Sequence, residues 1–192
     1  PSGAYQAGDE GTIRHVRSDQ ILDWERPLYD VILVLTRNDF CFVSVLGSVT
    51  GVITRADIQK PVVRMWLFGI ITLIESELTN RIEAKWSDDG WTALASPKRL
   101  ERARDLWKER KRRNQPCTLL SCLQLSDKAQ IMLQDPKTLA EYGFSSKGSA
   151  KRVLKEIESL RNNLAHAQDI VSNDWAQIAR LARNFFEHAW NW

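Results

Sequence analysis

Apolar residues recur at helical spacing through much of the second half of the chain. Around residue 160 they occupy Val153, Ile157, Leu160, Leu164 and Ala167, at intervals of four and three. Such intervals place these side chains on one face of an α-helix and leave the other face polar. The pattern therefore predicts an amphipathic helix in this stretch.

Similar patterns predict the other helices from residue 61 onwards. They are expected over residues 61–86, 97–114 and 119–133 and from residue 174 onwards. Residues 121–128 are expected to join two short helices, with Ser126 and Asp127 as a possible cap inside the stretch. A loop is expected at residues 142–149, and Ser149 is expected to be the N-cap of the amphipathic helix.

The first sixty residues show a different pattern, in which short β-branched and aromatic runs are separated by turn residues. Strands are predicted at residues 12–16, 40–46 and 49–54, a turn at 47–48 and a helix at 27–36. The sequence thus predicts an α+β protein. A small α/β unit at residues 11–60 precedes an all-α bundle at residues 61–192.

Composition supports a folded core but does not identify a partner. The chain has 192 residues, of which 43% are hydrophobic, and its net charge of +3 is only mildly basic. Basic residues gather in two stretches, at residues 108–113 and 147–155. Such runs are either solvated helix faces or surfaces that attract phosphate, and both interpretations stay open.

The cysteines and the apolar runs indicate the compartment. Cys41, Cys117 and Cys122 are an odd number at irregular spacing, which fits neither a disulfide framework nor a zinc site. We therefore expect a reducing, cytoplasmic setting and no metal. The apolar run Val62–Ile74 is interrupted by Arg64 and is too short to span a bilayer, so no membrane partner is expected.

Arg161, Asn162 and His166 on the amphipathic helix are candidate catalytic residues. Arginine carries a permanent charge on a planar fork that fits phosphate, and histidine transfers protons near neutral pH. Together they suffice to cleave RNA without metal: a base deprotonates a ribose 2′-hydroxyl, which attacks the adjacent phosphate, and a cation stabilises the developing charge. The alternative is a surface ion pair between Glu158 and Arg161, beside a solvated histidine.

The spacing of this pair raises a geometric difficulty. On one regular helix the side chains of Arg161 and His166 point roughly 140° apart. They converge on one substrate atom only if the helix begins or bends near Arg161, or if two copies of the helix pack together.

The segment Arg161-Asn162-Asn163-Leu164-Ala165-His166 resembles the R-x4-6-H signature of the HEPN superfamily, including the polar residue after the arginine. This resemblance, over residues 61–192, implies a helical bundle that acts as a metal-independent endoribonuclease and needs no cofactor. It further implies a homodimer with both motifs in one cleft, and a role in toxin–antitoxin or phage-defence systems with an antitoxin partner. Acidic residues on the first helix, here Glu75 or Glu77, would orient Arg161. The alternative for these is a solvated face with pairs such as Glu77–Arg81.

A second resemblance concerns the end of the α/β unit. Gly51-Val52-Ile53-Thr54-Arg55-Ala56-Asp57 is similar to the end of a CBS motif, a family that binds adenosine nucleotides. The resemblance implies that Thr54 and Asp57 face the phosphate and ribose of an adenine nucleotide, which would be a regulatory ligand. The alternative is a plain hairpin followed by a helix that Thr54 or Asp57 caps. CBS motifs work in pairs, and the chain shows only one.

Two functional hypotheses follow. In the first, the helical bundle is an RNA-cleaving enzyme, with Arg161, Asn162 and His166 as its site, regulated through the CBS-like unit. In the second, the protein is a non-catalytic module that binds RNA or a nucleotide.

Overall fold

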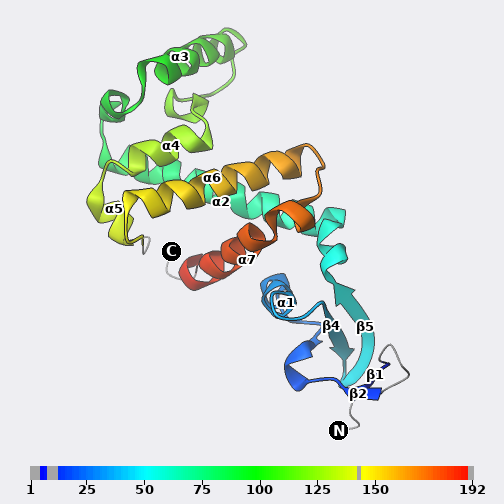
Figure 1. Cartoon of the computed structure of the whole chain (residues 1–192). Coiled ribbons are helices and arrows are strands. Elements are labelled where there is room, and N and C mark those ends of the chain that lie inside the picture. The colour runs from blue at the N-terminus through cyan, green and yellow to red at the C-terminus, as the bar shows by residue number, and fades with distance from the viewer. Residues whose placement is uncertain (1–4, 8–12, 142–143, 190–192) are drawn as a thin grey trace. The chain divides into compact units, whose positions relative to one another are not determined.

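The computed structural model describes residues 5–7, 13–141 and 144–189 (Figure 1). Its contacts divide the chain into two compact units. Unit 1 comprises Pro1–Leu67 with Ala167–Trp192, and unit 2 comprises Phe68–His166. The described residues form seven α-helices, a three-stranded sheet and a two-stranded hairpin, so the prediction of a mixed α+β protein is confirmed.

Unit 1 is built on a three-stranded sheet with the strand order β3-β4-β5. Strand β3 (Ile21–Asp23) runs parallel to β4 (Phe40–Val45), and helix α1 (Leu28–Leu35) connects the two. Strand β5 (Ser48–Thr54) returns antiparallel to β4, and Phe40 pairs with Thr54. The hairpin and the helix before it are therefore confirmed. The tight turn falls at Leu46 and Gly47, which both have positive φ angles.

The first strand of this sheet differs from the predicted one. Strand β2 (Ile13–His15) lies in the predicted range of 12–16, of which Thr12 is outside the described residues. It pairs with β1 (Tyr5–Ala7) in a separate antiparallel hairpin. The strand that precedes α1 in the three-stranded sheet is β3, which has only three residues and no periodicity that a sequence pattern would detect.

Helix α7 (Ile170–Ala189) completes the core of unit 1 by packing against α1. Ile32 and Leu35 of α1 and Ile170 and Ile178 of α7 are fully buried. The prediction that this helix begins near residue 174 is wrong. Asp169 caps it earlier, because its carboxylate accepts hydrogen bonds from the backbone N–H groups of Val171 (2.9 Å) and Ser172 (3.1 Å).

Unit 2 is helical. Helix α2 (Pro61–Lys85) begins in unit 1 and continues into unit 2. The other helices are α3 (Pro97–Arg112), α4 (Leu125–Met132), α5 (Pro136–Glu141) and α6 (Lys147–Ala165), with short 3-10 turns η3 (Gly90–Leu94) and η4 (Leu120–Cys122) between them. Ile71, Ile82, Leu120, Ile131 and Leu160 form its buried core, and α4 packs on α6. Helix α5 was not among the predicted elements.

The predictions about these helix ends have different outcomes. The predicted joint at residues 121–128 is confirmed, because η4 ends at Cys122 and α4 begins at Leu125. The cap predicted at Ser126 and Asp127 is wrong in position, because Gln124 is the N-cap and Asp127, inside α4, accepts a hydrogen bond from the Gln124 N–H at 3.2 Å. The prediction of Ser149 as the cap of α6 is wrong. Ser146 is the N-cap, and the Ser146 and Ser149 hydroxyls accept hydrogen bonds from each other's backbone N–H groups at 3.1 and 3.2 Å.

The compact units do not follow the predicted division between residues 60 and 61. Among the described residues, 61–67 and 167–189 belong to unit 1, so unit 2 is the shorter stretch Phe68–His166. The division into residues 11–60 and 61–192 stays a prediction. Within the described parts of the chain, no helix combines the length and apolar character needed to cross a membrane.

Candidate functional site

Arg161, Asn162 and His166 lie at the C-terminal end of α6. The helix begins at Lys147, far from Arg161, and His166 is its C-cap. The His166 N–H still donates to the carbonyl of Asn162 at 3.0 Å, so the helical hydrogen-bond pattern continues through the motif. Of the ways in which the two side chains could converge, a helix that begins near Arg161 is not observed. Packing of two copies of the helix stays a prediction.

This end of α6 has one buried and one exposed face. Leu160 and Leu164 are buried, whereas Arg161, Asn162 and His166 are exposed. Among the residues that the structure describes, no hydrogen bond or ion pair involves the Arg161 guanidinium, and the alternative pair with Glu158 is not formed. A permanent cation is thus presented to solvent, where it is available to an anionic ligand.

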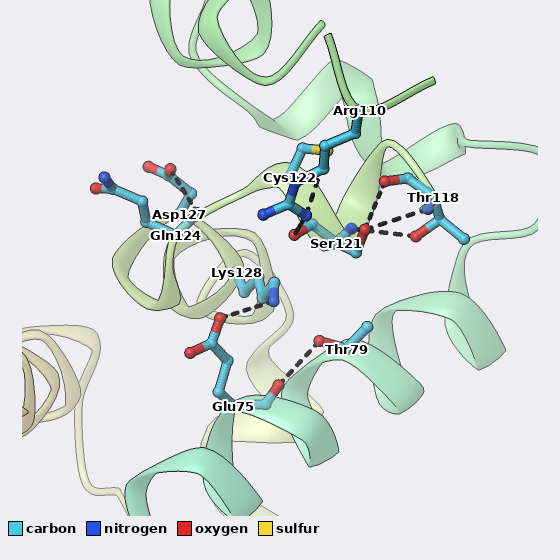
Figure 2. Close-up of polar contacts among 9 residues, drawn as sticks. All are labelled: Glu75, Thr79, Arg110, Thr118, Ser121, Cys122, Gln124, Asp127 and Lys128. Carbon is cyan, nitrogen blue, oxygen red and sulfur yellow. Dashed lines mark hydrogen bonds and ion pairs between the residues drawn. The ribbon is translucent and has the colours of Figure 1, made fainter. Parts of the chain in front are cut away.

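The two acidic residues proposed to orient Arg161 have other partners. In α2, Glu75 accepts a hydrogen bond from Lys128 at 2.9 Å (Figure 2). Glu77 pairs with Arg81, one turn along the same helix, at 2.5 Å. The predicted alternative, a Glu77–Arg81 pair, is therefore observed. A role for Glu75 or Glu77 beside Arg161 stays a prediction.

Lys128 is the polar residue of this region that sequence reasoning missed. Its side chain is only 5% exposed, against 27% for Glu75. The pair joins α4 to α2, and a buried ammonium needs such a partner because desolvation penalises an isolated charge. The sequence holds no signal for this burial, since a lysine on a short helix is usually solvated.

A second polar cluster fixes the segment around η4. Thr118 and Ser121 each accept a hydrogen bond from the other's backbone N–H at 3.1 Å. Arg110 of α3 lies 4.0 Å from the sulfur of Cys122 and 3.5 Å from the Ser121 carbonyl (Figure 2). Burial raises the pKa of the Cys122 thiol, although Arg110 opposes this rise. Cys122 is therefore a buried thiol in a structural cluster, and it lacks the depressed pKa of a reactive cysteine.

Thr54 and Asp57 lie where β5 ends and the 3-10 turn η2 (Arg55–Gln59) begins. The N–H and the hydroxyl of Thr54 both donate to Oδ2 of Asp57, at 2.7 and 2.9 Å. Lys60 contacts Oδ1 at 2.7 Å. These contacts from Lys60 and Thr54 lower the pKa of Asp57 from 3.8 to about 2. The alternative of a hairpin followed by a capped helical turn is therefore observed, and nucleotide binding stays a prediction.

A further polar cluster surrounds the start of α7 in unit 1. The amide oxygen of Gln59 accepts hydrogen bonds from Arg64 (3.0 Å) and from the N–H of Ile170 (3.4 Å), and its amide nitrogen contacts Asp169. Hydrogen bonds led by that from the Ser172 hydroxyl lower the pKa of Asp169. The cluster holds residues 59 and 64 against a helix that is more than a hundred positions away in sequence, so local patterns could not reveal it.

Comparisons with known proteins add no assignment. No family model matches the chain, and no curated protein or solved structure does. Within the described residues, no group of three or more histidine, cysteine or acidic side chains is placed to hold a metal ion. The candidate functional site therefore depends on the end of α6 alone.

Proposed function

We propose that the chain is a metal-independent endoribonuclease of the HEPN type, with Arg161, Asn162 and His166 as its catalytic residues. The observation that carries this proposal is the exposed end of α6. There the Arg161 guanidinium has no hydrogen bond or ion pair among the described residues. The exposed imidazole of His166 follows about 1.4 helical turns later. Cleavage of RNA needs a cation for the phosphate and a group that moves protons, and both are accessible here.

In the proposed reaction, His166 accepts the proton of a ribose 2′-hydroxyl. The 2′-oxygen then attacks the adjacent phosphorus, and the bond from phosphorus to the 5′-oxygen breaks. Arg161 stabilises the charge on the non-bridging oxygens, and Asn162 donates a hydrogen bond to the same phosphate. The leaving 5′-oxygen takes up a proton, so the products are a 2′,3′-cyclic phosphate and a 5′-hydroxyl. No cofactor is required.

The regular course of α6 adds a condition. Because Arg161 and His166 diverge on one helix, a working site needs Arg161 of one copy beside His166 of another. We therefore propose a homodimer as the active form. Its role in a toxin–antitoxin or phage-defence system, an antitoxin partner and a cytoplasmic location are part of the same proposal.

The first test compares wild type with His166→Ala on RNA in the presence of EDTA. Wild type should cleave the RNA and leave 2′,3′-cyclic phosphate ends, which mass spectrometry identifies. The variant should be slower by about 10²-fold or more, as expected for loss of a general acid–base group. Equal cleavage by both proteins, or none by either, would remove the enzymatic proposal.

A complementation experiment tests the shared site. Arg161→Ala and His166→Ala should each be inactive alone. A mixture of the two, refolded together, should recover part of the activity, because a mixed dimer contains one site with both side chains intact. If the mixture stays as inactive as its components, the two residues do not combine across copies.

An adenine nucleotide at Thr54 and Asp57 is a weaker proposal. Such a ligand would have to displace the hydrogen bonds from Thr54 and the contact from Lys60, which occupy both carboxylate oxygens of Asp57. Internal satisfaction of the carboxylate favours a capping role over a binding role.

A further inference from the structure

The positive charge of the chain is concentrated on α3. Residues 97–113 contain nine basic and three acidic side chains, a net charge of +6. The whole chain carries +3, so all other residues together carry −3. A single helix of unit 2 is thus strongly cationic on an otherwise slightly acidic chain.

The basic residues of α3 fall into two groups. Arg99 and Arg110 serve the fold, since Arg99 pairs with the buried Asp127 at 2.8 Å and Arg110 reaches the η4 segment. The others lie on the exposed face, opposite the buried Ala103. We call this set the basic face of α3: Lys98, Arg102, Arg104, Lys108, Lys111 and Arg112.

Helix stability does not explain the basic face. Like charges four residues apart repel each other, and the face contains three such pairs: Lys98–Arg102, Arg104–Lys108 and Lys108–Arg112. Cations are favourable in the last turn of a helix, but Lys98 lies in the first turn, where the helix dipole opposes it. The like-charge pairs therefore weaken the isolated helix, whereas the pairs of Lys108 with Asp105 and of Arg112 with Glu109 support it, and an external anion would offset the remaining repulsion.

Acidic neighbours neutralise only the later part of the face. Arg112 and the adjacent Arg113 both pair with Glu109, at 2.5 and 2.7 Å, and Lys108 lies 3.9 Å from Asp105. Within the described parts of the chain, Lys98, Arg102 and Arg104 make no ion pair. The face thus presents cations that are ready to contact a ligand.

We propose that the basic face of α3 binds the phosphate backbone of RNA. The identity of the polyanion as RNA rests on the proposed function. From Lys98 to Arg112 the cations extend over roughly 21 Å of helix, which suits a linear series of phosphates.

A membrane surface fits less well, because a helix that lies on a bilayer needs a large exposed apolar face. Leu106, at 40% exposure, is the one large hydrophobic residue of α3 among the exposed hydrophobic side chains of the described residues.

The test measures RNA binding separately from cleavage. Full-length protein carrying His166→Ala is titrated into a short, fluorescently labelled, unstructured single-stranded RNA, and anisotropy is recorded over a series of salt concentrations. The test variant adds Arg104→Gln, Lys108→Gln and Lys111→Gln. The control variant instead adds Arg17→Gln, Arg26→Gln and Arg37→Gln, three exposed cations of unit 1, and so has the same net charge.

The test variant should bind RNA about tenfold more weakly or worse at low salt. The slope of log Kd against log salt should fall by about two, since each lost phosphate contact removes about 0.7 for a single strand. The control variant should stay within about twofold of its parent, as expected for a small non-specific charge effect. The helix content of the test variant should stay close to that of its parent and its melting temperature within a few degrees, because relief of like-charge repulsion is offset by loss of the Lys108–Asp105 contact and of the contact between Lys111 and Trp107.

Equal weakening in the two triple variants would overturn the proposal, since net charge alone would then explain binding. Loss of binding to anionic phospholipid vesicles, with RNA binding unaffected, would assign the face to a membrane and would also overturn it. Failure of this binding proposal can be distinguished from failure of the proposed nuclease function. If RNA binds through α3 but wild type never cleaves it, the enzymatic proposal falls and the binding face remains.

Discussion

At the end of β5, Thr54 and Asp57 form hydrogen bonds with each other. At the end of α6, in contrast, the side chains of Arg161 and Asn162 are exposed to solvent. Both segments contain polar residues at spacings that resemble known functional motifs. At the first, the carboxylate of Asp57 accepts hydrogen bonds from Thr54 and contacts Lys60. At the second, the Arg161 guanidinium has no hydrogen bond or ion pair among the described residues.

The difference lies in what the local backbone requires. A chain that leaves a strand and enters a helical turn exposes N–H groups, and Thr or Ser followed by Asp three residues later supplies oxygens for such groups. The backbone around Arg161 and Asn162 requires nothing from their side chains, because the helical hydrogen bonds continue to His166 at the end of α6. A polar side chain there is therefore more informative about function than one at a helix start.

The largest expected effect comes from a substitution of Arg161 on α6 and tests whether its exposed side chain is catalytic. Arg161→Ala should lower kcat/KM for RNA cleavage by about 10² to 10³, because removal of one preorganised charge donor has effects of that size. The melting temperature should not change. Arg152→Ala on the same helix is the matched control and should stay within about threefold of wild type. A similar loss in both variants would show that α6 contributes only general positive charge.

The next effect concerns the acidic residues of α2. Glu75→Ala should reduce the free energy of unfolding by about 2–4 kcal/mol, because it leaves the buried Lys128 ammonium without its partner. Glu77→Ala removes a more exposed pair with Arg81 and should cost less than about 1 kcal/mol. Urea denaturation of both variants checks the difference. If Glu75→Gln instead leaves stability intact and impairs RNA cleavage, Glu75 belongs to the catalytic site.

The smallest effect tests the capping role of Asp57. Asp57→Asn should destabilise the fold by about 1–2 kcal/mol near neutral pH, since an ionised cap and its contact with Lys60 are lost. The pKa of Asp57 is lowered to about 2 in the folded state, so this stabilisation is present above pH 3.8 and declines as the pH falls toward 2. The difference between wild type and variant should therefore shrink between about pH 4 and pH 2, the range of the two pKa values.

Asp39→Asn is the control for the pH experiment, because Asp39 is 90% exposed and contacts Arg55 at 3.6 Å. Its unfolding free energy should stay within about 0.5 kcal/mol of wild type. A thermal-shift assay with adenine nucleotides extends the comparison. A rise in the melting temperature of wild type that is absent from Asp57→Asn would show that the carboxylate also binds a ligand.

The sequence predicts elements with a clear apolar pattern over many residues. It does not predict contacts between residues that are far apart along the chain. The helices α2, α3 and α6 and the β4–β5 hairpin follow from repeats of apolar residues. The parallel strand β3 is too short for a pattern, and the start of α7 at Ile170 depends on the cap that Asp169 provides, which the apolar spacing from residue 174 does not reveal. Burial of Lys128 depends on Glu75, more than fifty residues away in sequence.

The candidate site shows the same limit. The residue types and spacing of Arg161, Asn162 and His166 are visible in the sequence, but their exposure is not, because a helix wheel does not say which neighbours cover each face. The like-charge pairs of α3 could have been counted from the sequence. Their significance emerges only from the structure, in which Arg99 and Arg110 contact Asp127 and the η4 segment. Lys98, Arg102 and Arg104, in contrast, make no ion pair among the described residues.

Strand β5 has a practical consequence for work with the protein. It is one of the two outer strands of the three-stranded sheet that the described residues make, and Val49 and Val52 are 42% and 55% exposed. An outer strand with apolar side chains is a template on which other chains pair and aggregate. Purified samples should therefore precipitate on concentration or mild heating, and a lysine at position 52 should extend their shelf life.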